Sequence, residues 1–195
     1  MKKAVFIKTI SLLTVLVIFT CPVLAQDLKP IKLPAPQTTG GMPLMDALKN
    51  RHTSRSFSTK ELSPQVMSNL LWAAFGINRE DGRRTAPSAV NWQTLDVYVA
   101  TANGMYRHDP VNNVLEPVVA KDLRALTGKQ PFVKDAPVNL VYVANYDRIK
   151  GDMPEAQKER IGSLDSGYIG QNVYLYCASE GLETVVRGLI DKPAL

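Results

Sequence analysis

The chain has 195 residues, a formal net charge of +5 and 45% hydrophobic residues. This length is enough for one domain with a sizeable core. Three of the lysines, at positions 2, 3 and 8, lie in residues 1–25, which contain no acidic residue. Without that segment the formal charge is +2 (5 minus 3), so the basic balance gives no reason to expect a nucleic-acid partner.

Residues 1–25 have the pattern of a secretory signal peptide. Lys2 and Lys3 precede an apolar stretch at 9–19, and Val23 and Ala25 stand at the two positions where signal peptidase requires small residues. We therefore predict cleavage after Ala25 and an exported protein, periplasmic or extracellular. The apolar run is short for a membrane span, and contact with a membrane is expected only if the leader is retained.

Cysteine usage changes with that cleavage. Cys21 leaves with the leader, so Cys177 stands alone and the mature protein has no pair for an intrachain disulfide. Cys177 lies on the apolar side of a predicted helix, which indicates a core residue.

The rest of the chain divides into an arm and one domain. Residues 26–42 are rich in proline and have little periodic pattern, which predicts an extended N-terminal arm. Residues 43–195 show neither internal repeats nor a low-complexity tract, and we interpret them as a single domain.

Hydrophobic periodicity predicts helices and strands in mixed order within that domain. Helices are expected at 44–51, 63–76, 119–126 and 161–179, and strands at 95–99, 105–108, 114–118 and 138–144. The pair Ser63-Pro64 is typical of a helix start, and Gly181 of a helix end. Asn103-Gly104 predicts a tight hairpin turn. The continuous apolar run at 138–144 predicts a strand buried on both faces. Hairpins mixed with helices favour an α+β fold.

Residues 51–57, which read RHTSRSF, offer donors for a phosphate. Arg51 and Arg55 bracket one turn, so both guanidinium groups can reach a single phosphate, and hydroxyls can fill its remaining acceptor sites. The alternative is a solvated basic helix end that interacts with the helix dipole. His52 taken alone would more often be a surface or packing residue.

Residues 87–93, which read PSAVNWQ, follow about thirty residues later. The amides of Asn91 and Gln93 can hydrogen-bond in either sense and can read the edge of a flat heterocycle. A Pro-Ser turn with a polar surface is the alternative. Arginines that can bind a phosphate, together with amides that can recognise a heterocycle, suggest a nucleotide-like cofactor.

A third stretch completes a family pattern. Residues 170–175 read GQNVYL, and residues 178–185 read ASEGLETV. With the two motifs above, in this order and spacing, the chain from about Pro43 onward resembles the nitroreductase-like family of FMN-dependent oxidoreductases. Residues 53–57 and the long C-terminal helix are most similar to the branch that contains azoline dehydrogenases.

The resemblance implies a fold, a cofactor and an assembly. The fold is α+β, with a mixed, mainly antiparallel sheet flanked by helices. FMN would bind at the two interface sites of a homodimer. The reaction would be ping-pong, with hydride or electrons passing through flavin N5 to or from a small organic substrate. The resemblance names no donor, acceptor or catalytic side chain.

The resemblance also assigns cofactor-binding residues to three segments. Arg51, His52, Thr53 and Arg55 would hold the phosphate and ribityl chain. Pro87, Ser88, Ala89, Asn91 and Gln93 would contact the ring system from the partner subunit. Val186, Arg187 and Gly188 would lie near N5, chiefly through backbone amides. The side chain of Arg187 would either reach flavin or substrate or lie at the surface.

One departure from the family pattern motivates a second hypothesis. Family members continue into a last strand, whereas this sequence ends at Leu195, so we expect the domain to be C-terminally incomplete. The alternative function is a truncated, non-catalytic family member that acts as a ligand- or partner-binding module.

Other common chemistries lack their sequence signals. His52 and His108 are the only histidines, and neither has metal-ligand spacing to cysteine or carboxylates. No G-x-S-x-G motif is present. We interpret Asp165 as surface charge on a helix, and residues 78–84 as a solvated loop or a lid over an acidic substrate.

Overall fold

The computed structural model describes residues 27–190, 192, 193 and 195, so the predicted leader lies outside the described residues. The helices are α1 (Leu44–Asn50), α2 (Pro64–Phe75) and α3 (Glu155–Glu180), and the strands are β1 (Ile31–Lys32), β2 (Leu95–Ala100), β3 (Met105–Asp109), β4 (Val114–Val119) and β5 (Asn139–Ala144). Within these residues, no helix combines the length and apolarity needed to cross a membrane.

The five strands form one sheet in the order β1-β4-β3-β2-β5, and every neighbouring pair is antiparallel. The tight turn at Asn103-Gly104 joins β2 to β3, as predicted. Gly104 has a φ of +156°, and a Cβ there would lie 2.5 Å from the carbonyl oxygen of Val119. Only glycine fits where the turn between β2 and β3 approaches the end of β4 this closely.

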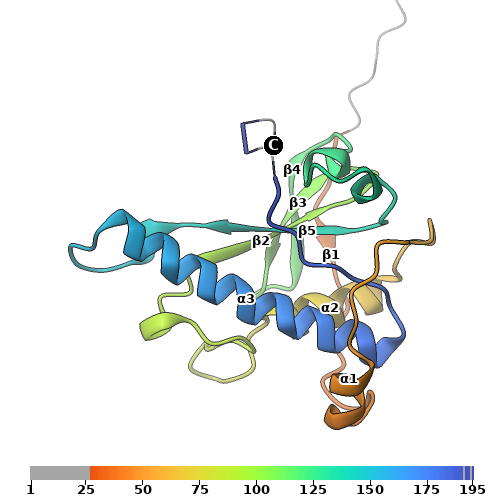
Figure 1. Cartoon of the computed structure of the whole chain (residues 1–195), viewed down its shortest axis with the longest axis horizontal. Helices are drawn as coiled ribbons and strands as arrows, with labels where there is room; N and C mark the ends of the chain where they lie inside the picture. The colour runs from red at the N-terminus through yellow and green to blue at the C-terminus, as the bar shows by residue number, and fades with distance from the viewer. Residues whose placement is uncertain (1–26, 191, 194) are drawn as a thin grey trace, which may run out of the picture.

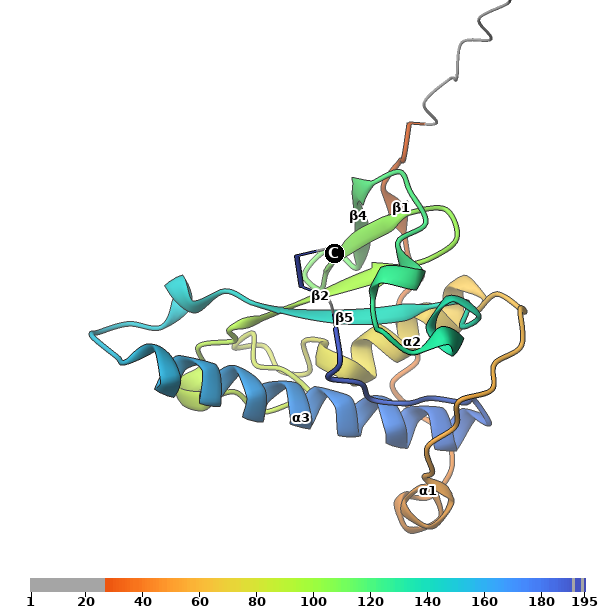
Figure 2. The same cartoon turned by 45° about the horizontal axis from the view of Figure 1, so that its top comes forward.

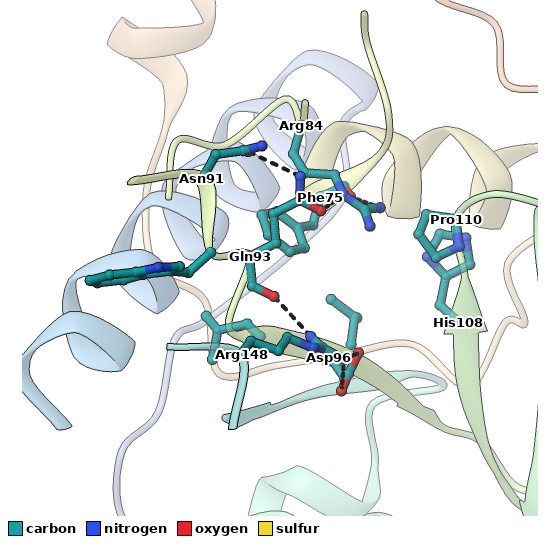
Figure 3. Close-up of a pocket in the computed structure, with 11 residues that line it drawn as sticks. Phe75, Arg84, Asn91, Gln93, Asp96, His108, Pro110 and Arg148 are labelled. Atoms are coloured by element: carbon teal, nitrogen blue, oxygen red, sulfur yellow. Dashed lines mark hydrogen bonds and ion pairs between the residues drawn. The ribbon is translucent and has the colours of Figure 1, made fainter. Parts of the chain in front are cut away.

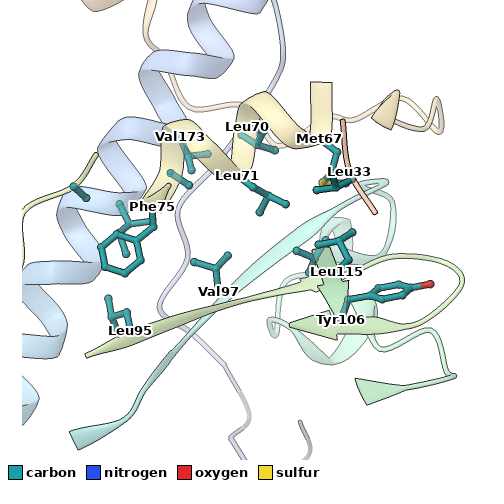
Figure 4. Packing of buried hydrophobic residues seen from close by; sticks show 14 of the residues in the cluster. Leu33, Met67, Leu70, Leu71, Phe75, Leu95, Val97, Tyr106, Leu115 and Val173 are labelled. Atoms are coloured by element: carbon teal, nitrogen blue, oxygen red, sulfur yellow. The ribbon is translucent and has the colours of Figure 1, made fainter. Parts of the chain in front are cut away.

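The helices α2 and α3 cover one face of the sheet, and α1 lies at the C-terminal end of α3 (Figures 1 and 2). Leu71 and Val173 from the two helices pack with Leu95 and Val97 of β2 in the main core (Figure 4). The alternation along β2 puts Leu95, Val97 and Val99 on this face. Cys177 is buried in the same cluster, so its prediction as a core residue is confirmed. The α+β prediction is also confirmed.

The opposite face has a smaller core. Ala100, Met105, Leu123 and Val141 form a second buried cluster. Leu123 belongs to the segment 120–138, which contains two short 3₁₀-helices, Arg124–Leu126 and Pro131–Lys134. This segment closes the second face near the start of β5.

Residues 27–38 contain no helix or bend, and residues 27–42 contact the domain at several points. Ile31 and Lys32 pair with Leu115 and Val114 of β4. Leu33 is buried in the main core. The boundary between arm and domain stays a prediction.

The helix starts and ends follow local rules. The hydroxyl of Ser63 accepts from the backbone N–H of Val66, as expected of an N-cap. Gly181 ends α3 with a φ of +66°, and its N–H donates to the carbonyl of Cys177. α3 begins at Glu155, directly after Pro154 and earlier than the predicted residue 161.

Two predicted elements are wrong in part. Residues 119–126 are not one helix, because β4 continues to Val119 and only Arg124–Leu126 form a 3₁₀ turn. Asp122 accepts from the backbone N–H of Arg124, which favours a local turn. The strand at 138–144 is not buried on both faces. The side chain of Val143 is 42% exposed and is not part of the second buried cluster.

Candidate functional site

The loop after α1 is held against α3 by Tyr174. The guanidinium carbon of Arg51 lies 5.1 Å from the centroid of the Tyr174 ring, which places the cation over the ring face. The hydroxyl oxygens of Thr53 and Tyr174 are 2.9 Å apart. The first predicted motif is therefore attached to the C-terminal half of the long helix.

The segment after α3 runs back alongside that helix (Figure 1). The backbone N–H of Val186 donates to the Tyr174 hydroxyl at 3.0 Å. Because that oxygen accepts from Val186, its own proton is available for Thr53. The backbone N–H of Ser54 donates to the carbonyl of Thr184 at 3.0 Å. The first and third motifs, which are distant in sequence, thus meet at Tyr174.

His52 lies at this meeting point with both ring nitrogens engaged. Nδ1 is 2.9 Å from the carbonyl oxygen of Asn50, and Nε2 is 3.2 Å from a carboxylate oxygen of Glu183. Both partners are acceptors, so they favour the doubly protonated ring. The carbonyl of Asn50 and, next, the charge of Glu183 raise the pKa of His52 above 6.5.

The remaining residues of these two motifs differ in exposure. Arg55, Val186 and Gly188 are exposed. Arg187 is half-buried, and its Nη2 donates to the side-chain oxygen of Asn139 at 2.7 Å. Burial lowers the pKa of Arg187. Its side chain packs against Thr127 and Asn139 at the start of β5, so the alternative of a free surface residue is wrong.

The second motif lies elsewhere along α3. The hydroxyl of Ser88 donates to Oδ2 of Asp165 at 2.7 Å and accepts from the backbone N–H of Gln93 at 2.8 Å. Val90, Asn91 and Gln93 all have positive φ, at 50°, 57° and 50°. A positive φ is uncommon in residues other than glycine, so three of them in one short segment are unusual. Backbone conformations of this kind concentrate at functional sites. Pro87 is exposed, and Ala89 begins a 3₁₀ turn.

Within one chain the second motif does not join the other two. Its contact on α3 is Asp165, whereas theirs is Tyr174. Nine residues of helix separate these positions, which is about 14 Å of axial rise. The single chain therefore assembles two of the three predicted segments at one place.

Several site residues differ from what local sequence patterns predict. Tyr174 stands in the GQNVYL stretch of residues 170–175, and nothing in that stretch indicates its role. Asp165 is 2% exposed rather than a surface charge, and it accepts a hydrogen bond from Ser88. Arg84 is partly buried beside Gln93, so it is not part of a solvated loop. The described residues contain no group of three metal-ligating side chains.

Comparison with known proteins identifies the family. The model of the Nitroreductase family matches residues 48–195. The chain belongs to the Nitroreductase family. A nitroreductase-family protein of Methanocaldococcus jannaschii is 32% identical over 158 residues, covering 74% of this chain and 78% of that protein. Nitroreductase-family membership was the expectation from the three motifs, and it is confirmed.

Solved structures of the family agree with the fold. A nitroreductase-family protein from Ralstonia eutropha JMP134 has a TM-score of 0.79 at 47% identity, covering 84% of this chain and 78% of that one. A chain of the Escherichia coli microcin synthetase McbBCD complex has a TM-score of 0.57 at 20% identity, covering 87% and 71%. That second likeness shows the nitroreductase fold alone.

Another family homologue, from Desulfovibrio desulfuricans, has been solved in complex with FMN. It shares 20% identity and a TM-score of 0.46, over 71% of this chain and 63% of that one. FMN binding is a property of that homologue.

Proposed function

We propose that this protein is an exported, FMN-dependent oxidoreductase of the Nitroreductase family, with a small organic substrate and a ping-pong reaction. The observation that carries the proposal is the convergence of residues 51–54 and 183–186 on Tyr174. The sequence resemblance assigns the first segment to the flavin phosphate and the second to N5, so one cofactor would bridge segments that are already adjacent.

The donor set at this convergence suits a phosphate and a ribityl chain. Arg51 rests on an aromatic face, which orients its forked N–H groups while its charge is retained. Thr53 adds a hydroxyl, and the raised pKa of His52 favours its positively charged form. Glu183 balances His52, which leaves Arg51 and Arg55 as the cations for a phosphate.

Bound FMN would supply the atom that accepts and returns hydride. The chain's own contribution would be to bind and orient the ring. The amide of Val186 is already hydrogen-bonded to Tyr174. The amides of Arg187 and Gly188 are therefore the proposed donors toward N5.

A homodimer is part of the proposal, because the second motif lies about 14 Å along α3 from Tyr174. A partner subunit could present its own residues 87–93 to the flavin held by the first chain. Apolar side chains suitable for an interface are exposed on two helices. They are Leu44, Met45 and Leu48 on α1 and Leu164 and Tyr168 on α3.

The visible absorption spectrum of the purified full-chain protein, with and without added FMN, tests the cofactor. We expect protein-bound flavin bands that are lost in Arg51→Ala/Arg55→Ala. The matched control is Arg79→Ala/Arg83→Ala, which removes two exposed arginines from the 78–84 loop. A folded protein that takes up no FMN would contradict the proposal and support the alternative of a non-catalytic binding module.

Export has its own test. When the gene is expressed with its leader, the intact mass of the purified protein should correspond to loss of residues 1–25. A protein that retains these residues would contradict the predicted cleavage after Ala25.

A further inference from the structure

A cavity of about 410 Å³ lies at the end of the sheet where β2 begins, behind residues 87–93. Its charged lining residues are Arg84, Asp96 and Arg148, and His108 also lines it. Figure 3 shows Gln93 between the two arginines, with His108 and Pro110 on another side of the cavity. The volume is within the range of small-molecule sites.

Arg148 has a carboxylate partner. Its Nη2 lies 2.8 Å from both carboxylate oxygens of Asp96, and its Nη1 donates to the carbonyl of Gln93 at 2.8 Å. The charge of Arg148 is therefore balanced inside the cavity, and the pair forms a fixed wall.

Both hydrogen-bond acceptors of Arg84 are neutral groups. Its Nε donates to the side-chain oxygen of Gln93 at 2.8 Å, and its Nη1 to the carbonyl of Phe75 at 3.3 Å. Its guanidinium carbon lies 5.2 Å from the centroid of the Phe75 ring. Burial, and then the charge of Arg148, lower the pKa of Arg84, and the charges of Asp96 and Asp109 offset this only in part.

Among the described residues, the other titratable groups do not form an ion pair with Arg84. Asp109 acts on it only through its charge, because Asp109 is not among the lining residues and its carboxylate accepts from the amides of Val111 and Asn112 in its own turn. Burial lowers the pKa of His108, so this ring is neutral at neutral pH. Two guanidinium groups against one carboxylate leave the cavity with one excess positive charge.

We propose that this cavity binds a small organic carboxylate that carries a single negative charge, with Arg84 as its main ligand. The single negative charge of such a ligand would neutralise the one excess positive charge of the lining residues. The planar fork of a guanidinium matches the two oxygens of a carboxylate. Phe75, Val97 and Pro110 provide apolar walls for the organic part.

This site goes beyond the proposed flavin function and stands without it. Asn91 and Gln93 are shared with the proposed flavin segment, whereas Arg84, Asp96 and Arg148 are not. Uptake of FMN and binding of the carboxylate are therefore separate measurements, and either can fail alone.

Isothermal titration calorimetry of the full-chain protein with benzoate tests the proposal. We expect saturable binding that Arg84→Gln weakens by about 10- to 100-fold, the range for loss of a hydrogen bond to a charged group. The matched control is Arg83→Gln, because Arg83 is the exposed neighbour and is paired with Asp81 outside the cavity. This variant should bind benzoate like the unmodified protein. Equal binding by the two variants, or no saturable binding by the unmodified protein, would overturn the proposal.

Two further titrations use the unmodified protein, so they do not depend on the folding of a variant. Benzamide has the shape of benzoate without the charge and should bind at least tenfold more weakly. Phenyl phosphate carries more negative charge than the cavity balances and should also bind more weakly. Benzamide binding as tightly as benzoate would refute the role of charge, and tighter binding of phenyl phosphate would refute the carboxylate class.

Discussion

The hydroxyl of Ser88 donates to the buried carboxylate of Asp165 over 2.7 Å, and this bond attaches residues 87–93 to α3. A buried carboxylate without a hydrogen bond is costly, so the pair couples the folding of the loop to that of the helix. We expect Ser88→Ala to lower the free energy of unfolding by about 1–3 kcal/mol.

Ser88→Ala also removes the acceptor for the amide of Gln93, so the pair is best measured in a double-mutant cycle with Asp165→Asn. Urea unfolding of the four proteins should give a coupling energy of about 1–2 kcal/mol. Additive effects of the two substitutions would contradict a direct interaction.

The pKa of His52 is predicted to depend on Glu183. The folded-state pKa is raised above 6.5, so the stabilisation from this contact is fully present below 6.5 and is lost as the pH rises through the folded-state pKa. In Glu183→Gln the pKa should fall, because the charge and the hydrogen bond of Glu183 are lost while the carbonyl of Asn50 remains. An NMR titration of the ring measures this shift, and Glu180→Gln is the control at the same helix end. An unchanged pKa in Glu183→Gln would rule out the pairing.

Tyr174→Phe separates the two roles of Tyr174. The ring that supports Arg51 remains, but the hydrogen bonds to Thr53 and Val186 are lost. Under the proposed function we expect weaker FMN binding, by about 5- to 100-fold for one or two lost hydrogen bonds. A fluorescence titration with FMN measures the dissociation constant. Thermal unfolding of the flavin-free variant provides the control, and an unchanged dissociation constant would show that these bonds do not organise the site.

Leu71 should be among the most sensitive core positions. It lies on α2, its side chain is 0% exposed, and it packs in the main core with residues of α3 and the sheet (Figure 4). We expect Leu71→Ala to lower the free energy of unfolding by about 2–5 kcal/mol, from lost burial and the cavity that remains. Val111→Ala is the exposed control, and urea unfolding measures both. A change below about 1 kcal/mol in Leu71→Ala would contradict this packing.

The proposed homodimer predicts that α1 is sensitive to charge. Met45 and Val111 are each 74% exposed, the first on α1 and the second in the turn between β3 and β4. We expect Met45→Glu to weaken self-association and Val111→Glu to leave it unchanged, because only the first would bury a charge in the interface. Analytical ultracentrifugation decides this, and a dimer unaffected by Met45→Glu would place the interface elsewhere.

Local sequence signals predicted much of the fold. The N-cap at Ser63, the stop at Gly181 and the turn at Gly104 depend on one or a few neighbouring residues, so they are readable without tertiary contacts. The predicted helix at 119–126 failed because Val119 pairs with Met105 of β3, a contact that no local pattern reports.

The candidate site was predictable in its parts and not in its arrangement. The motifs at 51–57 and 87–93 can be recognised in the sequence by their hydrogen-bond donors. Nothing in them indicates that Tyr174 joins Thr53 of the first motif to Val186. The burial of Asp165 was missed for the same reason, since its partner Ser88 is distant in the sequence.

The sequence by itself determined the family, the α+β class and the residue types available for binding, because periodicity and motif spacing are properties of the linear chain. The tertiary structure alone decided which of these residues meet. The length of α3 keeps Asp165 and Tyr174 apart, and the pairing of β5 with β2 brings Arg148, which follows β5, to Gln93, the residue that Arg84 also contacts. Distances between residues far apart in the sequence follow from packing, which no local pattern encodes.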